Sequence, residues 1–211
     1  MNQTACTPVI DERRRSRETT RADRVGCSRY LNSRLKRSMD VATAIILVLP
    51  VAAMILFLML VVLAVDGWPP VIWQRRAGKA GCPFSMPKLR TMRRTSGGSP
   101  QDITSLGRVL RRLRLDELPQ VFCVITGSMS LVGPRPELEE TAATYGQRET
   151  ERLIATPGIT GLWQVRGRRD RPIHAQLRYD LLYLQRASLG LDMLLLVSTF
   201  RFLIHPKTNQ L

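Results

Sequence analysis

Hydrophobic residues are distributed unevenly along the chain, and one long run dominates the pattern. Residues 41–65, VATAIILVLPVAAMILFLMLVVLAV, carry no charge. As a helix they would be about 37 Å long, enough for the roughly 30 Å hydrocarbon core of a bilayer. The run begins behind a long polar segment, too late for an ordinary cleaved signal peptide. We therefore expect a membrane helix at 34–66; a buried core helix is the weaker alternative.

Two features bear on whether this helix crosses the membrane. Basic residues crowd both of its flanks, whereas a spanning helix concentrates them on its cytoplasmic side. Pro50 lies inside the run and removes a backbone hydrogen bond, which divides the run into pieces of roughly 14 Å and 22 Å. Prolines also occur in true transmembrane helices, so a full span with the N-terminus outside stays open. We favour a Pro-kinked, re-entrant helix.

After this helix, short apolar runs alternate with Gly and Pro, which is typical of a small mixed domain. We expect strands near 71–75 and 84–92. The helix predicted at 105–115 is apolar on one face and arginine-rich on the other, so it can lie in the membrane interface or cover a core. Residues 118–127 continue as a helix or a strand. The apolar run 191–204 predicts a helix that packs on the body or lies at the interface.

The predicted fold is mixed α/β and mostly helical. It is a monotopic membrane protein in which one N-terminal re-entrant, Pro-kinked helix and interfacial amphipathic helices surround a small cytoplasmic domain. Residues 1–33 form a basic N-terminal arm without apolar periodicity, which predicts disorder. Residues 34–66 form the re-entrant helix, and 67–211 the membrane-associated cytoplasmic domain.

The charge adds an anionic partner to this picture. Lys and Arg number 32 against 17 acidic residues, giving a net charge of +15 and a pI near 11.0. Such a balance suits nucleic acid, anionic lipid or phosphate-bearing substrates. Aromatic residues make up only 6% of the chain, which supplies few platforms for stacking bases and argues against nucleic acid. The four widely spaced cysteines make a zinc site or a disulfide framework unexpected.

Adjacent acids interrupt the basic pattern in RRLRLDELPQ, residues 111–120. Asp116 and Glu117 follow a run of arginines and leucines. Taken alone, the pair fits a helix N-terminus, with Asp as the N-cap and Glu in the first turn. The usual nucleophile systems are absent from the sequence, because it has no GxSxG and its two histidines lie far from any obvious Ser or Cys partner.

Two further segments suggest phosphate binding. SLVGPRPELEE places Arg135 between two prolines, and Pro136 favours an extended backbone at Arg135, so that its guanidinium projects from a stiff segment. Such a fork suits a pair of phosphate oxygens. TPGITGLWQVRGR, residues 156–168, predicts a Gly-rich turn and a short strand that ends in Arg168. Neither segment is a known nucleotide fingerprint.

These motifs together resemble those of the bacterial sugar transferases, the monotopic polyprenyl-phosphate phosphoglycosyl transferases. The resemblance runs from about residue 35 to residue 199. It rests on KRSMD, the helix proline, QRRAG, KLRTM, LDELPQ, GSMSLVGPRP, PGITGLWQVRGR and YDLLYL, in this order. It implies that a nucleoside-diphosphate sugar, usually a UDP-sugar, donates sugar-1-phosphate to a polyprenyl phosphate such as undecaprenyl phosphate and releases UMP. The cytoplasmic domain is then a catalytic domain at the inner (plasma) membrane of a bacterium.

The resemblance also implies roles for the acidic pair. Asp116 would be the nucleophile that forms a covalent phosphosugar intermediate, and Glu117, with Asp116, would hold Mg²⁺ or Mn²⁺. Attack of a carboxylate on a diphosphate brings two negative charges together, so neutralising cations should dominate catalysis. We expect the nearby arginines to keep Asp116 ionised and a divalent cation to bridge carboxylate and phosphate oxygens.

Other residues follow from the same scheme. The expected phosphate-binding residues are Lys88, Arg111, Arg135, Arg76 and Arg168. Lys36 and Arg37 would bind the acceptor phosphate or lipid head groups, and Asp40 would pair with Arg37 or a neighbour. Asp180 and Gln164 would support the site without taking part in the chemistry.

Some positions depart from the family pattern. Cys123 stands where Asn usually follows LPQ, Arg166 replaces a frequent Asn, and Leu49 precedes the helix proline where many members have Ser. These departures leave the sugar and nucleotide preference open. The principal rival is a membrane-tethered, non-catalytic protein that binds nucleic acid or regulates a partner. We expect no nucleic-acid partner, and a homodimer is compatible with the scheme.

Overall fold

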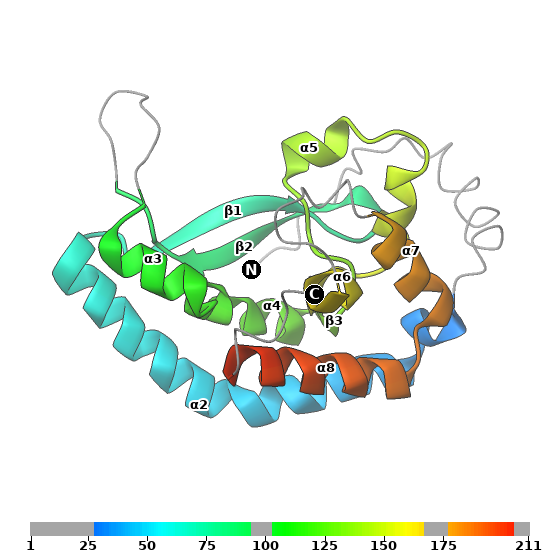
Figure 1. Cartoon of the computed structure of the whole chain (residues 1–211), viewed down its shortest axis with the longest axis horizontal. Helices are drawn as coiled ribbons and strands as arrows, with labels where there is room; N and C mark the ends of the chain where they lie inside the picture. Colours follow the sequence, from blue (N-terminus) through cyan, green and yellow to red (C-terminus); the bar gives the residue numbers. More distant parts are fainter. Residues whose placement is uncertain (1–27, 94–102, 167–176, 205–211) are drawn as a thin grey trace.

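The computed structural model describes residues 28–93, 103–166 and 177–204 (Figure 1). Arg168, both histidines and most of the N-terminal arm lie outside these residues. The elements, in chain order, are η1 Arg29–Asn32, α2 Arg34–Asp66, β1 Val71–Ala77, η2 Lys79–Gly81, β2 Pro83–Leu89, α3 Ser105–Arg112, η3 Leu115–Gln120, α4 Val121–Thr126, β3 Ser130–Val132, α5 Glu139–Ala143, η4 Glu149–Ile154, β4 Gly158–Thr160, α6 Leu162–Arg166, α7 Leu177–Arg186 and α8 Leu189–Ile204. The expectation of a mixed, mostly helical fold is confirmed.

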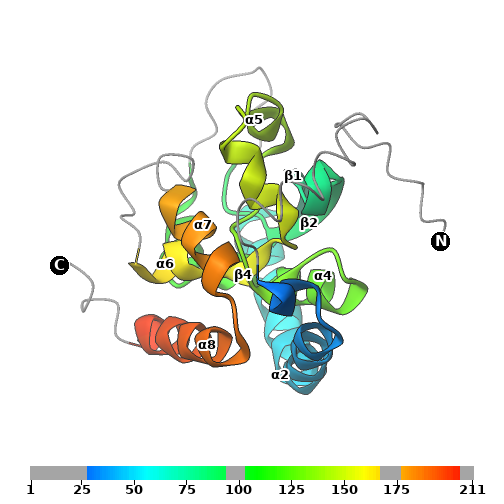
Figure 2. The same cartoon turned by 90° about the vertical axis from the view of Figure 1, so that its right-hand side faces the viewer.

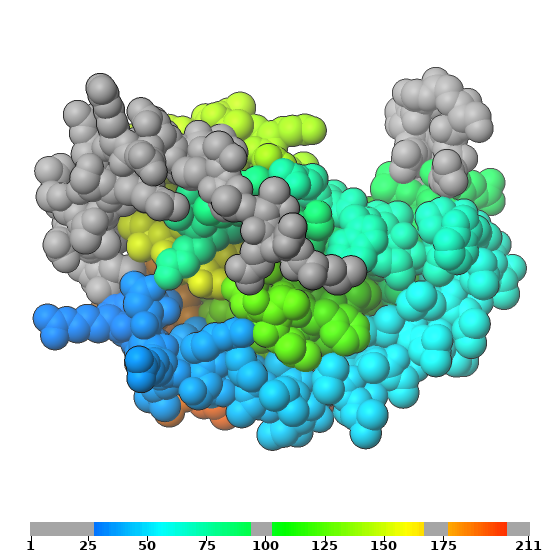
Figure 3. All heavy atoms as spheres, turned by 180° about the vertical axis from the view of Figure 1, so that it is seen from behind, coloured from blue at the N-terminus to red at the C-terminus, as the bar shows by residue number. Residues whose placement is uncertain are grey.

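Helix α2 is the longest element, and it forms a continuous band along one edge of the molecule (Figure 3). It begins at the N-cap Ser33, whose Oγ accepts the Lys36 N–H at 3.1 Å. Pro50 lies inside the helix without ending it, and the two halves run in different directions (Figure 1). By length and composition, α2 could cross a membrane.

Both ends of α2 are held by the rest of the fold. Near its start, Lys36 and Asp40 are buried against other elements. At its end, Gly67 adopts φ +80° and donates its N–H to two carbonyls of the last turn. The Arg90 guanidinium then binds the carbonyls of Asp66, Gly67 and Trp68, the last at 2.9 Å. These contacts satisfy carbonyl groups that a helix end otherwise leaves unpaired.

Two small sheets carry the loops of the site. Strands β1 and β2 form an antiparallel hairpin in which Val71 pairs with Leu89 and Ala77 with Pro83, which confirms the two predicted strands. Strands β3 and β4 pair in parallel. A Cβ on Gly158, the first residue of β4, would lie 2.1 Å from the nitrogen of Gly133, the residue that follows β3. Glycine is therefore needed in GSMSLVGPRP and PGITGLWQVRGR, because the backbones of these two segments approach each other too closely for a side chain.

The core divides into two clusters of buried side chains. The larger one gathers residues from α2, α4, β3, α7 and α8, among them Ala44, Val124, Leu131, Tyr183 and Leu195. The smaller one packs Leu110 of α3 against Leu58 and Val62 of α2 and Leu89 of β2. Helix α3 therefore covers a core, although Val109 and Leu113 are exposed.

Helices α2 and α8 lie along the same side of the molecule (Figure 2). Both expose large apolar side chains, including Ile46, Leu49, Phe57 and Val65 on α2 and Leu194, Val197 and Phe200 on α8. Water would solvate such a surface poorly, so it marks a membrane or protein contact. The structure is thus compatible with a monotopic membrane protein. Helix α8 packs on the body, which is one of the two alternatives expected for residues 191–204.

Two details differ from the sequence-based picture. Arg29–Asn32 forms a short 3₁₀ helix, and Ser28 donates its N–H to the Leu184 carbonyl at 2.8 Å. The last residues of the predicted arm therefore belong to the folded body, because Tyr30 and Leu31 pack against the core. Cys82 is disulfide-bonded, so the expectation of no disulfide is wrong at this position.

Candidate active site

A sharp turn between α3 and η3 presents the acidic pair. Arg114 adopts φ +57°, a left-handed conformation that is uncommon for a residue other than glycine. Element η3 starts directly after it, with Asp116 and Glu117 in its first turn. The N-cap position belongs to Arg114, and no side chain caps this helix. Asp116 is therefore not an N-cap, and the capping interpretation does not account for the pair.

Glu117 is surrounded by cations from three parts of the chain. Its carboxylate lies 3.3 Å from Lys88 Nζ and 3.5 Å from Arg114 Nη1, and it accepts hydrogen bonds from both Nη atoms of Arg135. Burial alone would raise the pKa of Glu117. The three cations outweigh burial and lower this pKa to about 2. Glu117 is thus ionised throughout the physiological pH range.

Asp116 has a different environment, although it is the next residue. It is 7% exposed, and none of the ion pairs among the described residues involves it. Burial and the neighbouring Glu117 raise its pKa, and Lys88 and Arg111 offset this only in part. We expected the nearby arginines to keep this carboxyl ionised. The cations do not lower the pKa of Asp116, because they contact Glu117 and burial dominates at Asp116; that Asp116 is ionised in the protein stays a prediction.

The predicted phosphate-binding residues are only partly gathered. Lys88 and Arg135 contact Glu117, and Arg76 donates to the Pro136 carbonyl at 3.2 Å, next to Arg135. Arg111 donates to Thr91 Oγ1 at 2.8 Å and lies close enough to Asp116 to influence its pKa. Their contacts with phosphate stay predictions.

Arg114 was missed by the sequence reasoning, although its spacing of three residues from Glu117 is a signal for an ion pair. The aromatic neighbour of the site was missed as well. The Trp163 ring lies 6.0 Å from the guanidinium carbon of Arg135, within the range of a cation–π contact.

The carboxylates can hold a divalent cation only with help from a ligand. Among the described residues, no group of three or more His, Cys, Asp or Glu side chains is placed to bind a metal. Mg²⁺ is commonly held by one or two carboxylates together with substrate phosphates and water. Asp116 and Glu117 fit that pattern, since none of the cations in the described segments forms an ion pair with the Asp116 carboxylate.

An apolar pocket of about 250 Å³ opens beside the acidic pair. Leu47 and Val51 of α2 line it, and Thr199 comes from α8. Its polar lining residues include Glu117, Arg114 and Gln164. The structure therefore places an ionised carboxylate and its cations next to an apolar space lined by residues of α2 and α8, the two helices that expose large apolar side chains.

Comparison with known proteins assigns the chain to a family. Residues 31–206 match the model of the bacterial sugar transferases. The chain is 38% identical to the sugar transferase EpsL of Bacillus subtilis, over 79% of this chain and 86% of that one. It is 33% identical to the exopolysaccharide production protein ExoY of Rhizobium meliloti, over 84% and 88%. It is 36% identical to the UDP-glucose:undecaprenyl-phosphate glucose-1-phosphate transferase of Caulobacter vibrioides, over 78% and 67%.

The chain belongs to the bacterial sugar transferase family. This bacterial sugar transferase is an enzyme, a phosphoglycosyl transferase. Its acidic pair, the cations around Glu117 and the apolar pocket accordingly belong to a candidate active site. The non-catalytic rival interpretation does not hold.

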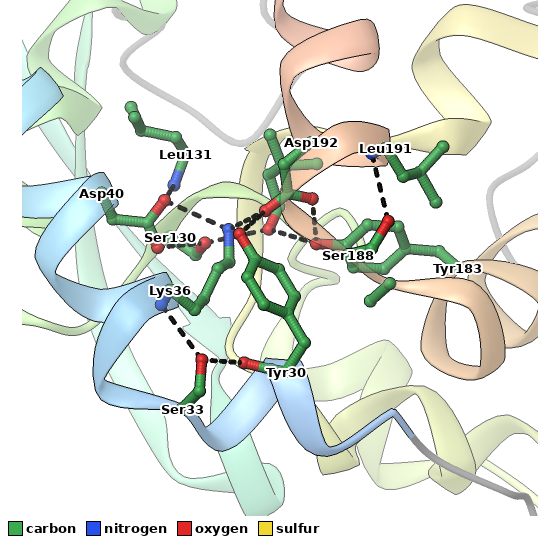
Figure 4. Close-up of polar contacts among 12 residues, drawn as sticks. Tyr30, Ser33, Lys36, Asp40, Ser130, Leu131, Tyr183, Ser188, Leu191 and Asp192 are labelled. Atoms are coloured by element: carbon green, nitrogen blue, oxygen red, sulfur yellow. Dashed lines mark hydrogen bonds and ion pairs between the residues drawn. The ribbon is translucent and has the colours of Figure 1, made fainter.

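Of the two residues of this sugar transferase expected to bind lipid head groups, Lys36 is buried in the fold (Figure 4) and Arg37 is exposed. Lys36 Nζ lies 3.1 Å from Asp40 Oδ1 and 2.7 Å from Asp192 Oδ2, and Lys36 is 5% exposed. These contacts argue for a structural role of Lys36 and against one in binding the acceptor phosphate, because its ammonium is buried and already paired with two carboxylates. Arg37 donates to the carbonyls of Val124 at 2.6 Å and Ile125 at 2.9 Å, near the end of α4.

The expected supporting residues have different surroundings, and only Gln164 lines the pocket beside Glu117. Asp40 was expected to pair with Arg37 or a neighbour, and it pairs with Lys36. It also accepts a hydrogen bond from Ser130 Oγ at 2.6 Å. Gln164 donates to the Ile159 carbonyl at 3.1 Å, and its buried Oε1 has no hydrogen-bond partner in the described part of the chain. Asp180 lies 2.7 Å from Arg152 Nη2. Arg152 carried no distinctive sequence signal and was missed.

Proposed function

We propose that the protein transfers sugar-1-phosphate from a UDP-sugar to undecaprenyl phosphate, or a similar polyprenyl phosphate, with release of UMP. The observation that carries this proposal is the acidic pair, which lies among surplus cations at an apolar pocket between two membrane-facing helices. A phosphate-bearing lipid needs both environments side by side. The printed name of the Caulobacter relative, which includes UDP-glucose and undecaprenyl phosphate, agrees with this substrate pair.

In the proposed reaction Asp116 attacks the phosphorus that carries the sugar. A bond forms between its carboxylate oxygen and phosphorus, the diphosphate bond breaks, and UMP leaves with the bonding electrons. An oxygen of the polyprenyl phosphate then attacks the same phosphorus and releases Asp116. Burial supports this role, because a desolvated carboxylate of raised pKa is a more basic oxygen than one in water.

The cations around Glu117 would lower the barrier by offsetting the charge of the diphosphate. Arg135 offers a planar fork for two oxygens, and Lys88 and Arg114 offer further charge. Mg²⁺ or Mn²⁺, held by Asp116, Glu117 and phosphate oxygens, would supply additional neutralisation and orient the diphosphate. The enzyme's own residues thereby bind the donor and hold the phosphorus in line with Asp116.

We further propose that α2 is re-entrant and that the body lies on the cytoplasmic face of the inner membrane. Support comes from both ends of α2, since Lys36 pairs with Asp192 of α8 and Arg90 binds the last carbonyls of the helix. A spanning helix would place those ends on opposite sides of the bilayer, where one folded body could not hold both. The isoprene chain of the acceptor would enter the apolar pocket from the lipid side.

The test of the activity is turnover by purified protein. We expect UMP release in the presence of Mg²⁺, undecaprenyl phosphate and one member of a panel of UDP-sugars. Without the lipid phosphate, UMP release should stop after a single turnover. A folded protein that releases no UMP with any donor would contradict the proposal.

The topology has its own test. Single cysteines at the exposed positions Arg34 and Ser85, on either side of α2, should both resist an impermeant thiol reagent in intact cells. Both should react after the membrane is permeabilised. Labelling of one of them in intact cells, beyond that of the parent protein, would show a spanning helix instead.

A further inference from the structure

The backbone that carries Arg135 is fixed by an unusual series of contacts. Four consecutive carbonyls, at residues 134–137, each accept a hydrogen bond from a different donor. In order, the donors are the Gly158 N–H at 2.8 Å, Arg152 Nη2 at 2.8 Å, Arg76 Nη1 at 3.2 Å and the Ala77 N–H at 2.9 Å. Three of these donors approach the prolines and Glu137, whereas Arg152 binds the carbonyl of Arg135 itself.

Arg152 is buried and fully engaged. It is 2% exposed, its Nη1 donates to the Tyr145 hydroxyl at 3.0 Å, and the same atom lies 3.7 Å from Glu137. Its Nη2 contacts Asp180 of α7 at 2.7 Å while donating to the Arg135 carbonyl. Asp180 is also 2% exposed. The buried ion pair between Arg152 and Asp180 thus connects α7 to the main chain of Arg135, the residue that pairs with Glu117.

We propose that Arg152 and Asp180 are positioning residues that set the guanidinium of Arg135 against Glu117 and the diphosphate. The inference rests on the proposed function. Because prolines stiffen both sides of Arg135, displacement of its carbonyl moves the side chain as a unit. A misplacement of about 1 Å at a catalytic group can lower a rate about 100-fold. Neither residue needs to touch substrate for this effect.

A double-mutant cycle tests the proposal. Asp180→Asn and Arg152→Lys should each lower kcat/KM for the UDP-sugar about tenfold and weaken UMP binding by a similar factor. In an Arg135→Lys background, the same changes should have little further effect, because they act through Arg135. Equal losses in both backgrounds would mean a merely structural role and would overturn the proposal.

Two measurements keep the test decisive. Calorimetry measures UMP affinity without turnover. If the wild type binds UMP but is inactive, the proposed function is contradicted, and the effect of Arg152 and Asp180 on Arg135 can still be tested. Arg152→Lys keeps the charge beside Asp180, and it covers the case in which Asp180→Asn does not fold. Asp192→Asn is the matched control, since it removes another buried acid with a cation at 2.7 Å; per folded molecule, it should leave UMP affinity unchanged.

Discussion

Two of the clusters of buried acids and bases in the described part of the chain differ in charge balance. The Lys36 cluster comprises Lys36, Asp40 and Asp192 together with the hydroxyls of Tyr30 and Tyr183, which donate to Asp192 at 3.0 Å and 2.8 Å. The active-site cluster comprises Asp116, Glu117, Lys88, Arg114 and Arg135. In the first, carboxylates outnumber the cation and hydroxyl donors complete the set. In the second, cations outnumber carboxylates.

This difference separates a structural cluster from a binding site. The partners in the Lys36 cluster bond to one another, and they join the start of α2 to α8 through charged side chains that are at most 5% exposed. The active-site cluster keeps a positive surplus beside partly exposed side chains; Arg114, for example, is 27% exposed. A surplus of buried cations is costly unless an anion joins them, and a diphosphate meets that requirement.

Replacing the proposed nucleophile should produce the largest effect, a loss of activity without a loss of stability. Asp116→Asn keeps the shape of the side chain and removes its charge, so the active-site cluster keeps its cations but loses the attacking oxygen. We expect turnover to fall by at least about 10³-fold, with no covalent phosphosugar adduct and an unchanged unfolding temperature. UMP release, intact-protein mass spectrometry and thermal unfolding check these three outcomes. Retained turnover in Asp116→Asn would end the nucleophile assignment.

The opposite behaviour is expected for the Lys36 cluster. Lys36→Met leaves two buried carboxylates without their cation, which should lower the free energy of unfolding by about 3–5 kcal/mol. Activity per folded molecule should change little. Thermal or denaturant unfolding in detergent measures the loss, and Lys79→Met, at an exposed lysine that binds Asn32, should stay within about 0.5 kcal/mol of wild type. Equal stability of the two variants would show that the Lys36 cluster is not an anchor.

The sequence predicted the elements of both clusters but not their partners. The apolar run, the strands of the hairpin and the acidic pair were recognisable because period, turn residues and motif order are local properties. KRSMD and RRLRLDELPQ are similar at this local level, since each places acids beside bases, and so the two segments suggest the same kind of role. Asp192 lies far along the chain from Lys36, and Arg135 lies 18 residues from Glu117. Which base is neutralised depends on those tertiary contacts, so the roles of Lys36 and of Arg152 could not be predicted locally.

A milder change should sharpen the role of the surplus charge. Arg135→Lys keeps one positive charge but loses the planar fork that binds two oxygens at once. We expect kcat/KM for the UDP-sugar to fall by about 10–100-fold while the protein stays folded. Steady-state kinetics provide the measurement. Arg75→Lys is the control, because Arg75 pairs with Glu139 at an exposed surface site where such pairs contribute little.

The smallest expected effect is a pH dependence that separates the two acids of the active-site cluster. Glu117, whose pKa is about 2, stays ionised under any condition in which the protein is assayed. Burial raises the pKa of Asp116 above its ordinary value of 3.8, so the reactive ionised form should be lost at a higher pH than for an exposed aspartate. Asp180, with a pKa raised by burial to about 6 despite Arg152, should add to the same acid limb.

The pH profile of kcat/KM, measured from about pH 5 to 8, should therefore fall on the acid side and level off toward neutrality. In Asp180→Asn the limb should move to lower pH, because the carboxyl whose pKa is raised to about 6 is then missing. The folded fraction must be followed at each pH, since protonation of Asp180 also shifts the folding equilibrium: its raised pKa favours the folded state below about pH 4 and this contribution is lost as pH rises through 6. A profile that stays flat through pH 6 in folded wild-type protein would contradict a contribution of Asp180 to the acid limb.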